Sequence, residues 1–277
     1  MKKERIDVLL VEQGLFETRE KAKRAVMAGI VYCDENRLDK PGEKINVESK
    51  LTVKGKKLQY VSRGGLKLEK ALQVFDIDMK DKVLLDIGSS TGGFTDCALQ
   101  NGAKQSYALD VGYNQLAWKL RQDERVIVME RTNFRYVTPA DLEGEMPNIA
   151  SIDVSFISLK LILPVLKTLL SSGSNVIALV KPQFEAGRDQ VGKKGIVRDK
   201  KVHESVLETI IEFAKNEGYI IKNLSFSPIT GGDGNIEFLL HLYWAEDVKN
   251  EQHYYHIKET VESAHNELKT KKETNID

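Results

Sequence analysis

The stretch that most constrains the fold runs from Lys82 to Thr95, KVLLDIGSSTGGFT. Val83 to Ile87 form a short, almost wholly apolar run, which is typical of a strand covered on both faces in a parallel sheet. Glycine and hydroxyl residues follow at once, and glycine lets the backbone approach a ligand where a Cβ would clash. A helix is expected from Phe94 onward, with its N-terminus pointing at that ligand. The stretch therefore predicts a nucleotide-type site at the carboxyl end of a strand.

The spacing of the glycines narrows the choice of ligand. Gly-x-x-x-Gly-Gly differs from the dinucleotide fingerprint Gly-x-Gly-x-x-Gly, and it lacks the Gly-Lys-Ser/Thr of a phosphate-binding loop. An acid before the first glycine, with no lysine in the loop, suits a cationic ligand without phosphates, and S-adenosylmethionine is such a ligand. Asp110 ends the next predicted strand, 24 residues after Asp86, where an acid can bind both ribose hydroxyls.

An ordinary turn capped by polar residues is the alternative to a cofactor site, and the combination of the glycine loop with the second acid favours the cofactor. A residue after the third predicted strand could bond the adenine edge, although a plain turn residue is an equal alternative there. The predicted cofactor-binding residues are Asp86, Gly88, Ser89, Ser90, Gly92, Gly93, Phe94, Asp110 and, in that last position, Asn133.

Composition limits the class of protein. The 277 residues, 41% of them hydrophobic, suffice for one good core and a small companion domain. Lys plus Arg and Asp plus Glu balance at 41 each, but residues 1–60 carry 14 basic and 10 acidic side chains, a net charge of +4. Cys33 and Cys97 are too few and too far apart for a disulfide framework or a zinc site, so we expect a cytoplasmic protein without a metal. Neither a membrane span of ~20 apolar residues nor a signal peptide is expected.

Residues 1–60 are predicted to form a separate small α+β unit. Apolar residues at helical spacing predict a first helix that ends near Gly14, and Thr18 is expected to cap a second helix that Gly29 closes. Short strands with turns at residues 34–36 and 40–42 follow. Residues 50–60 have the character of a basic, strand-like linker.

The pattern of this unit resembles the αL RNA-binding domain, which occurs in a ribosomal protein, in pseudouridine synthases and in other RNA-modifying proteins. The resemblance rests on RIDVLL from Arg5, on TR at 18–19 with alanines at 22 and 25, on GIV at 29–31 and on KPG at 40–42. On charge alone, a solvated helix face is the alternative. The resemblance implies that four side chains lie against RNA phosphates and position the RNA without reading its sequence, namely Arg5, Arg19, Lys23 and Arg24.

From Lys82 the chain alternates strand-like and helix-like segments, the pattern of a doubly wound α/β fold. Strands are predicted at 83–87, 105–110, 126–130, 149–154, 175–180, 219–226 and 236–243, and helices at 92–101, 114–122, 159–171 and 201–217. Only SPITGGDGN separates the last two strands, so these should pair antiparallel beside a mostly parallel sheet. The prediction is a Rossmann-like methyltransferase domain over 61–245, with a helix that Ser62 caps at its start and a hydrophilic helical or frayed tail over 246–277.

Ligands of such sheets bind beyond the carboxyl ends of the strands. Asp153 ends the fourth predicted strand, Lys181 ends the fifth, and Glu237 lies in the last hairpin among apolar residues. A charged residue in such surroundings is costly unless it is paired. One such residue could be a structural ion pair, but three at the edge that carries the glycine loop indicate an active site. Lys67 stands one helical turn from Arg63, and on spacing alone it is a solvated helix residue.

Together with Lys67, these residues resemble the Lys-Asp-Lys-Glu tetrad of the FtsJ-type ribose 2′-O-methyltransferases. A closer resemblance is to the TlyA family, and it rests on SRGGLKLEKAL, DIGSSTGGFTD, DVGYNQL, SIDVSFISL, LVKPQFEAGR, VGKKGIVRD and GNIEFLLHL. Members of that family combine an αL domain with an FtsJ-like methyltransferase and are named rRNA cytidine 2′-O-methyltransferases or haemolysins. The resemblance covers residues 4 to about 244. It implies an S-adenosylmethionine-dependent rRNA methyltransferase that acts on ribosomal RNA or a ribosomal subunit.

The chemistry of ribose methylation gives the tetrad a purpose. A 2′-hydroxyl is a poor nucleophile until its proton leaves, so the enzyme must hold the oxygen in line and receive that proton. A lysine can do this if burial and cationic neighbours lower its pKa. The predicted catalytic residues are Lys67, Asp153, Lys181 and Glu237. We expect Lys181 to accept the proton, with Asp153 and Glu237 orienting it and Lys67 steadying the hydroxyl or a phosphate.

The glycine-rich, basic segment GRDQVGKKGIVRD follows Lys181 and suits a lip that closes over RNA, with a solvated loop as the alternative. RNA-binding candidates outside the first unit are Arg63, Arg188, Lys193, Lys194 and Arg198. Two other functions remain. A membrane-active haemolysin is disfavoured because the sequence shows no apolar span, no strongly amphipathic basic helix and no export signal. An inactive RNA-binding ribosome assembly factor is disfavoured by the intact loop and tetrad.

Overall fold

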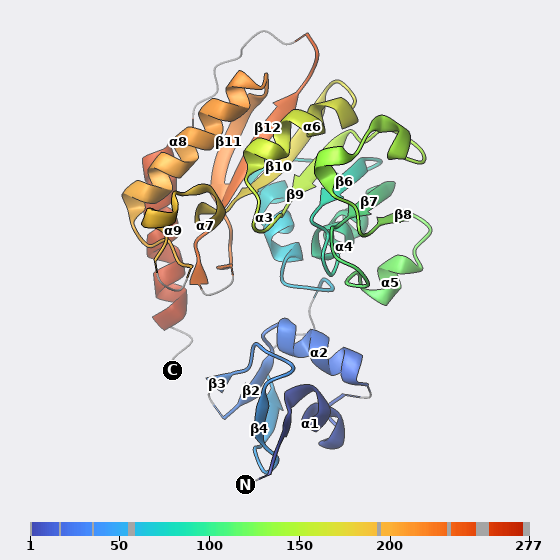
Figure 1. Ribbon diagram of the computed structural model, residues 1–277, viewed down its shortest axis with the longest axis vertical. Helices are drawn as coiled ribbons and strands as arrows, with labels where there is room; N and C mark the ends of the chain where they lie inside the picture. Colours follow the sequence, from blue (N-terminus) through green and yellow to red (C-terminus); the bar gives the residue numbers. More distant parts are fainter. Residues whose placement is uncertain are drawn as a thin grey trace. The chain divides into compact units, whose positions relative to one another are not determined.

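The computed structural model describes residues 2–16, 18–34, 36–54, 59–192, 195–231, 234–247 and 255–273, with side chains in the last range as far as Leu268. The chain divides into two compact units, Met1–Arg63 and Gly64–Asp277, each with its own secondary structure (Figure 1). We take the two units in turn.

The first unit packs two helices on short strands. Its elements are β1 (Lys3–Arg5), α1 (Ile6–Glu12), α2 (Arg19–Met27), β2 (Val31–Cys33), β3 (Asn36–Arg37), β4 (Lys44–Asn46) and β5 (Leu51–Val53). β1 pairs with β4, and a second sheet has the order β3-β2-β5. Thr18 caps α2 as predicted, because its hydroxyl accepts a hydrogen bond from the backbone N–H of Lys21 at 3.3 Å.

One boundary in this unit differs from the prediction. Leu51–Val53 was assigned to the basic linker, but these residues form β5 and pair antiparallel with β2. Leu51 is only 3% exposed and packs with Ile6, Leu10 and Val26 in the core of the unit. The apolar side chain at position 51 supplies part of that core, which explains why the strand joins the sheet despite its basic neighbours.

The second unit is built on a seven-stranded sheet of order β11-β12-β10-β9-β6-β7-β8. Its strands are β6 (Val83–Ile87), β7 (Gln105–Leu109), β8 (Val126–Met129), β9 (Ile149–Ile152), β10 (Ser174–Val180), β11 (Ile220–Phe226) and β12 (Phe238–Trp244). β10, β9, β6, β7 and β8 run parallel, and β12 pairs antiparallel with both β10 and β11. The predicted fold class, a mostly parallel sheet with an antiparallel last strand, is confirmed.

Helices cover both faces of this sheet (Figure 1). The helices are α3 (Gly65–Phe75), α4 (Gly93–Gln100), α5 (Trp118–Arg121), α6 (Leu163–Leu166), α7 (Pro182–Glu185), α8 (Lys200–Asn216) and α9 (Ile257–Glu273). Val83, Leu85 and Ile87 of β6 share one core with residues of α6, α8 and α9. Asp86, which points to the other face, is hydrogen-bonded to Thr95 of α4. Because alternate residues of β6 point to opposite faces of the sheet, the core with α6, α8 and α9 lies on one face and α4 lies on the other.

Three predicted helix boundaries are wrong. α3 begins at Gly65 and Ser62 does not cap it, because the N-cap position is occupied by Gly64, which already has helical dihedral angles. The helix predicted at 114–122 shrinks to α5, because the Glu130 carboxylate accepts the backbone N–H groups of residues 114–116 and holds them in an irregular turn. The helix predicted at 159–171 divides into α6 and two 3₁₀ turns, at Leu159–Leu161 and Lys167–Leu169, around Pro164.

The segment from 246 onward was expected to be a hydrophilic helical or frayed tail. It contains the helix α9, and this helix packs into the core, which was not expected. Val261 and Ala264 are fully buried and Leu268 nearly so, in the same core as α8 and β11. The charged residues of α9 whose side chains the structure describes are exposed or half-buried, namely Lys258, Glu259, Glu262 and Glu267. Such a helix has the average composition of a hydrophilic tail even though one face is buried.

Candidate active site

Backbone hydrogen bonds and a glycine with positive φ determine the shape of the loop after β6. The N–H groups of Gly88 and Ser89 both donate to the carbonyl of Leu109 at the end of β7, at 2.8 and 3.0 Å. Gly88 has φ +85°, and a Cβ at this position would lie 2.6 Å from the backbone oxygen of Asp153. Only glycine can occupy this point, where β6 and the segment after β9 come together.

Asp110 ties the loop to the end of β7. Its Oδ2 accepts a hydrogen bond from the N–H of Ser90 at 2.8 Å, and its Oδ1 accepts one from the N–H of Gly112 at 2.7 Å. Each oxygen keeps a further lone pair for a ligand hydroxyl. The carboxylate is therefore both a support of the loop and an acceptor at the carboxyl end of the strand.

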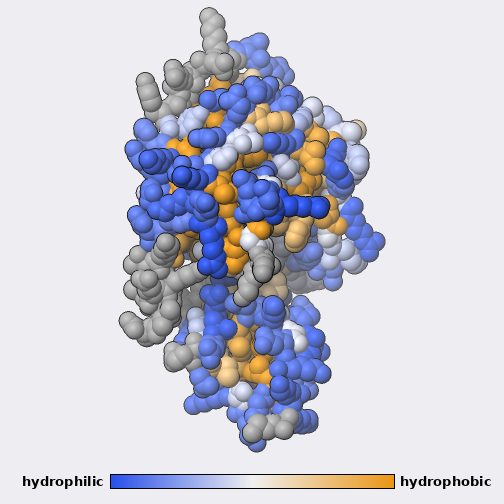
Figure 2. All heavy atoms as spheres, turned by 60° about the vertical axis from the view of Figure 1, so that its left-hand side comes forward, coloured by the Kyte–Doolittle hydropathy of each residue, from blue (hydrophilic) through white to orange (hydrophobic). Residues whose placement is uncertain are grey.

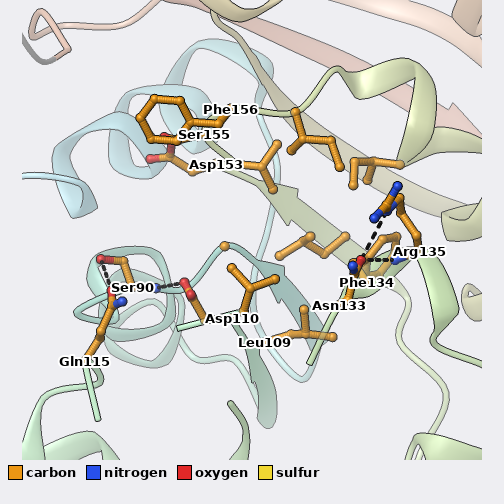
Figure 3. A pocket seen from close by; sticks show the side chains of 16 residues that line it. Ser90, Leu109, Asp110, Gln115, Asn133, Phe134, Arg135, Asp153, Ser155 and Phe156 are labelled. Carbon is orange, nitrogen blue, oxygen red and sulfur yellow. Dashed lines mark hydrogen bonds between the residues drawn. The ribbon is translucent and has the colours of Figure 1, made fainter. Parts of the chain in front are cut away.

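A pocket of about 430 Å³ opens at this edge of the sheet (Figure 3). Its floor is apolar, and polar groups enter it from several strand ends. The residues that line it are Ile87, Gly88, Ser90, Leu109, Asp110, Val111, Gln115, Asn133, Phe134, Arg135, Asp153, Val154, Ser155, Phe156, Ile157 and Ile162. Its size and mixed lining are those of a site for a small organic ligand.

Four of the nine predicted cofactor residues line this pocket, namely Gly88, Ser90, Asp110 and Asn133. Asn133 also matches its alternative as a turn residue, because its Oδ1 accepts the backbone N–H of Arg135 at 3.2 Å and caps the 3₁₀ turn at Phe134–Tyr136. The five that do not line it are Asp86, Ser89, Gly92, Gly93 and Phe94. At position 92 the need for glycine comes from packing, because a Cβ there would clash with the side chains of Leu116 and Leu120.

Asp86 was expected to contact the cofactor, but its carboxylate is fully buried beneath the loop. Its Oδ2 accepts hydrogen bonds from the N–H and the hydroxyl of Thr95, and its Oδ1 accepts one from the hydroxyl of Ser151. Burial raises the pKa of Asp86 to about 6 despite these donors. The side chain points away from the pocket because alternate residues of β6 face opposite sides of the sheet. Its contacts make it a support that joins β6, β9 and α4.

The structure adds pocket residues that the sequence argument did not single out. Gln115 and Ser155 lie in loops, and Phe134 and Arg135 in a 3₁₀ turn, and all four follow strands of the sheet. The sequence could have identified these residues only by their position, because any residue within a few places of a parallel strand's carboxyl end can reach this edge.

The four residues of the predicted tetrad lie together, although they come from four separate segments. The Nζ of Lys67, on α3, lies 2.7 Å from Glu237 Oε2 and 3.3 Å from Asp153 Oδ2. The Nζ of Lys181, at the end of β10, lies 2.5 Å from Asp153 Oδ1 and donates to the hydroxyl of Ser155 at 3.2 Å. The cluster is a continuous chain of charges in the order Glu237, Lys67, Asp153, Lys181.

Burial and opposite charge act against each other in this cluster. Lys67 and Lys181 are each 7% exposed and Glu237 is 2% exposed. Burial disfavours the charged form of Lys67, but the attraction of Asp153 and Glu237 outweighs it, and the pKa of Lys67 is raised. Burial likewise disfavours ionised Asp153, but the two lysines hold its pKa below the ordinary value. Opposite charge thus outweighs burial at both Lys67 and Asp153 and favours the ionised form of each.

The pairing corrects one expected contact. Glu237 was expected to orient Lys181, but its carboxylate is bound to Lys67, and the amide of Gln183 lies on its other oxygen at 3.5 Å. The reason is the position of α3, which brings Lys67 between the two acids and leaves Asp153 as the acid that reaches Lys181.

An exposed aromatic side chain stands beside the tetrad. Phe156 is 90% exposed, lines the pocket, and has φ +64°, a backbone conformation that is unusual for a bulky residue. Its ring centroid lies 4.9 Å from that of Phe184, three residues after Lys181. Strained backbone of this kind concentrates at functional sites.

The basic residues assigned to RNA binding have different surroundings. Arg5 and Arg19 both pair with the fully buried Asp7, at 2.8 and 2.9 Å, and the hydrogen bonds of Arg5 above all lower the pKa of Asp7 to about 2. Lys23 pairs with Glu20. The other candidates are Arg24 and Arg63, which are half-buried, Arg188 and Arg198, which are exposed, and Lys193 and Lys194, which lie outside the described residues.

The surface is largely polar. On the face that Figure 2 shows, hydrophilic residues cover most of the surface and hydrophobic ones show between them. Among the residues that the structure describes, no helix has the length and apolar character needed to cross a bilayer. The same part of the chain contains no group of three or more His, Cys, Asp or Glu side chains arranged to hold a metal ion.

Comparison with known proteins identifies both units. A family model described as FtsJ-like methyltransferase matches residues 60–244, and one described as S4 domain matches residues 4–51. YqxC of Bacillus subtilis, named as a candidate rRNA methyltransferase, is 72% identical over 273 residues, which cover 98% of this chain and 97% of YqxC. TlyA of Mycobacterium tuberculosis, named 16S/23S rRNA (cytidine-2′-O)-methyltransferase, is 40% identical over 239 residues, or 86% of this chain and 89% of TlyA.

A solved structure agrees with these sequence relatives. A protein from Streptococcus thermophilus, described as a candidate hemolysin, superposes on this chain with a TM-score of 0.79 at 60% identity, and the match covers 99% of each chain. The motifs of the glycine loop and the strand ends had indicated the same relationship. This chain belongs to the TlyA family of FtsJ-like methyltransferases, which carry an N-terminal S4 domain.

Proposed function

We propose that this protein uses S-adenosylmethionine to methylate a ribose 2′-hydroxyl of ribosomal RNA, at a cytidine. The FtsJ-like unit and the name of the TlyA relative support the reaction, and the S4 domain supports an RNA substrate. An rRNA-modifying enzyme works where ribosomes are assembled, so the proposal includes a cytoplasmic location.

The pocket residues fit S-adenosylmethionine. Asp110 offers two carboxylate oxygens at the end of β7, where ribose hydroxyls can donate to them. The amides of Asn133 and Gln115 and the apolar side chains of Leu109 and Phe134 suit an adenine ring. When bound, the cofactor supplies an activated methyl group on a sulfonium.

The observation that carries the proposal is the double position of Asp153. This residue lines the pocket and is also the acid that bridges Lys67 and Lys181. The pocket and the buried charged cluster therefore share a wall. A nucleotide at that wall would have its hydroxyl beside both the methyl donor and the lysines, the arrangement that in-line transfer needs.

The two lysines are suited to different tasks. Lys67 is bound by two carboxylates that raise its pKa, so it stays an ammonium ion and can stabilise negative charge or hold the hydroxyl. Lys181 has one carboxylate partner and a serine hydroxyl. In its neutral form the Nζ of Lys181 can accept the proton of the 2′-hydroxyl while Asp153 keeps it in place. Phe156 offers an exposed ring on which a nucleotide base can stack.

The experiment is methyl transfer with purified protein, labelled S-adenosylmethionine and ribosomal subunits from cells that lack the gene. Ribose-methylation mapping then locates the product. We expect one ribose-methylated cytidine with the natural protein and none with Lys181→Ala. Methylation of a base in place of a ribose would contradict the reaction, and RNA binding without any transfer would indicate an assembly factor instead.

A further inference from the structure

Two buried histidines connect α8 and α9, which pack side by side (Figure 1). The Nδ1 of His203, in the first turn of α8, lies 2.9 Å from the Nε2 of His265 in α9. His203 is fully buried and His265 is 5% exposed. Neither residue lines the pocket, and α9 lies beyond the segment that the FtsJ-like family model matches.

The partners of the pair fix its protonation pattern. The Nε2 of His203 lies 3.2 Å from the backbone oxygen of Val197, which can only accept a hydrogen bond. His203 must therefore carry its proton on Nε2, and in the neutral ring Nδ1 is then an acceptor. The bond between the rings consequently requires His265 to donate from its Nε2. The result is a directed relay from α9 through His203 to the Val197 carbonyl.

Val197 is also held from the opposite side. Its N–H donates to the side-chain oxygen of Asn235 at 3.0 Å, and the amide of Asn235 donates to the carbonyl of Gly195 at 2.9 Å. Residues 195–197 are thus hydrogen-bonded to α8 on one side, through His203, and to the turn that precedes β12 on the other, through Asn235. The next residue along is Arg198, whose side chain is exposed.

The same contacts reach the tetrad. Asn235 accepts the N–H of Gly231 through its backbone oxygen, and Gly231 packs so closely on the carboxylate of Glu237 that a Cβ would clash with it. The ring of His203 also meets the edge of Phe238, the residue after Glu237, with centroids 5.4 Å apart. The histidine pair therefore supports both the segment that carries Arg198 and the start of β12.

We propose that α9 is a positioning element for the RNA side of the active site, which it holds in place through the His265–His203–Val197 relay. The inference rests on the proposed function, because Arg198 is taken to contact the RNA backbone. His203 and His265 are positioning residues, since they touch no reacting group. If the donor at position 265 is lost, the segment 195–198 loses its fixed anchor and Arg198 is no longer held against a phosphate.

Two substitutions at one position test the relay in the full-length protein. His265→Phe keeps a ring of similar volume but removes the donor, whereas His265→Gln keeps an N–H donor for His203. We expect His265→Phe to raise the KM for the ribosomal substrate about tenfold, the effect of one lost buried hydrogen bond. His265→Gln should stay within about threefold of the natural protein, and the affinity for S-adenosylmethionine, measured by calorimetry, should be the same in all three.

A matched control separates positioning from plain helix packing. Glu262→Gln removes the ion pair between Glu262 of α9 and Lys200 of α8, which joins the same helices through residues other than the two histidines. The uncharged Gln also removes the attraction of Glu262 for His265 but leaves the histidine side chains in place. This control should keep the natural KM. Arg198→Ala should raise the KM by itself, and adding His265→Phe to it should change little, because both act through one contact.

The inference is overturned if folded His265→Phe has the natural KM, if His265→Gln fails as badly as His265→Phe, or if the losses from His265→Phe and Arg198→Ala add. RNA affinity is measured directly as well, by filter binding. Absence of methyl transfer by the natural protein would refute the proposed function, whereas the binding measurements would still decide the part that α9 takes.

Discussion

Lys67 and Glu237, 170 positions apart in the sequence, form a buried ion pair of 2.7 Å beside Asp153, which lines the pocket. The pair leaves Asp153 to bridge the two lysines. As a result, the two lysines have different surroundings: Lys67 has two acidic partners that raise its pKa and keep it a cation, whereas Lys181 has one acidic partner. Substitution of each lysine should therefore affect activity and stability differently.

Lys181→Ala should lower methyl transfer by about 10²–10⁴-fold while the protein keeps its fold and its cofactor affinity, because it removes a positioned proton acceptor. Lys181→Arg should do no better, since a guanidinium stays protonated. Single-turnover transfer at saturating cofactor measures the effect. Near-normal transfer by a stable Lys181→Ala protein would show that the proton goes elsewhere.

Lys67→Ala should behave differently, because it leaves the buried carboxylate of Glu237 without its cation. Breaking a buried pair in this way costs about 3–5 kcal/mol of stability. We therefore expect Lys67→Ala to lose both stability and activity, whereas Lys181→Ala leaves Asp153 still paired with Lys67. Urea unfolding of the two variants compares them, and equal destabilisation would contradict the arrangement.

Asp110→Asn should weaken S-adenosylmethionine binding by about 10-fold or more. An amide NH₂ cannot accept the N–H of Ser90 or Gly112, so one loop donor loses its partner and the ligand loses an acceptor. Calorimetry measures the affinity. Asp123→Asn is the control, because Asp123 pairs with Arg125 and is not among the residues that line the pocket. If both variants bind equally well, Asp110 does not contact the cofactor.

Titration of Asp86 should make the free energy of unfolding depend on pH. Its folded-state pKa of about 6 lies above the ordinary 3.8, so between these values the folded protein keeps a proton that the unfolded chain has lost. Stability should then fall as pH rises through this window, by about 3 kcal/mol at roughly 1.4 kcal/mol per pK unit. Asp86→Asn should remove that fall.

The comparison of Asp86→Asn with the natural protein is the measurement, made by denaturant unfolding at about pH 4 and about pH 7. Other titrating groups cancel in this difference, including His203, whose pKa burial above all lowers to about 4. His203 acts in the opposite direction, because its neutral form is favoured in the fold and stability is lost as pH falls from about 6.5 toward 4. A constant difference between the two proteins would refute the Asp86 assignment.

Arg24→Ala is the cleanest test of RNA binding by the S4 domain. It should weaken RNA binding and reduce the slope of log K against log salt by about 1, as expected for one lost phosphate contact. Arg19→Ala is less clean, because Arg19 also pairs with the buried Asp7 and its loss should destabilise the unit. An unchanged salt slope in Arg24→Ala would exclude a phosphate contact at this residue.

The sequence by itself determined the succession of strands along the chain and the fact that Asp153 and Lys181 follow strands of one sheet. These follow from local patterns, because apolar runs define strands and the residues after parallel strands must meet at one edge. Lys67 was singled out only by the family resemblance, and the order of the strands within the sheet came only from the structure. The motifs also placed the chain in its family before any contact was known. Asp110 could be expected at this edge in the same way, since it directly follows its strand, and it lines the pocket there.

Only the tertiary structure decided which charge pairs with which. Glu237 binds Lys67 rather than Lys181, and Asp86 faces the core rather than the pocket. The Val197 carbonyl connects to α9 through two histidines to which the sequence argument assigned no chemistry. Each of these contacts joins positions far apart in the chain or depends on which face of a strand a side chain occupies. A local pattern cannot specify them, because a shift of about one hydrogen-bond length changes the partner.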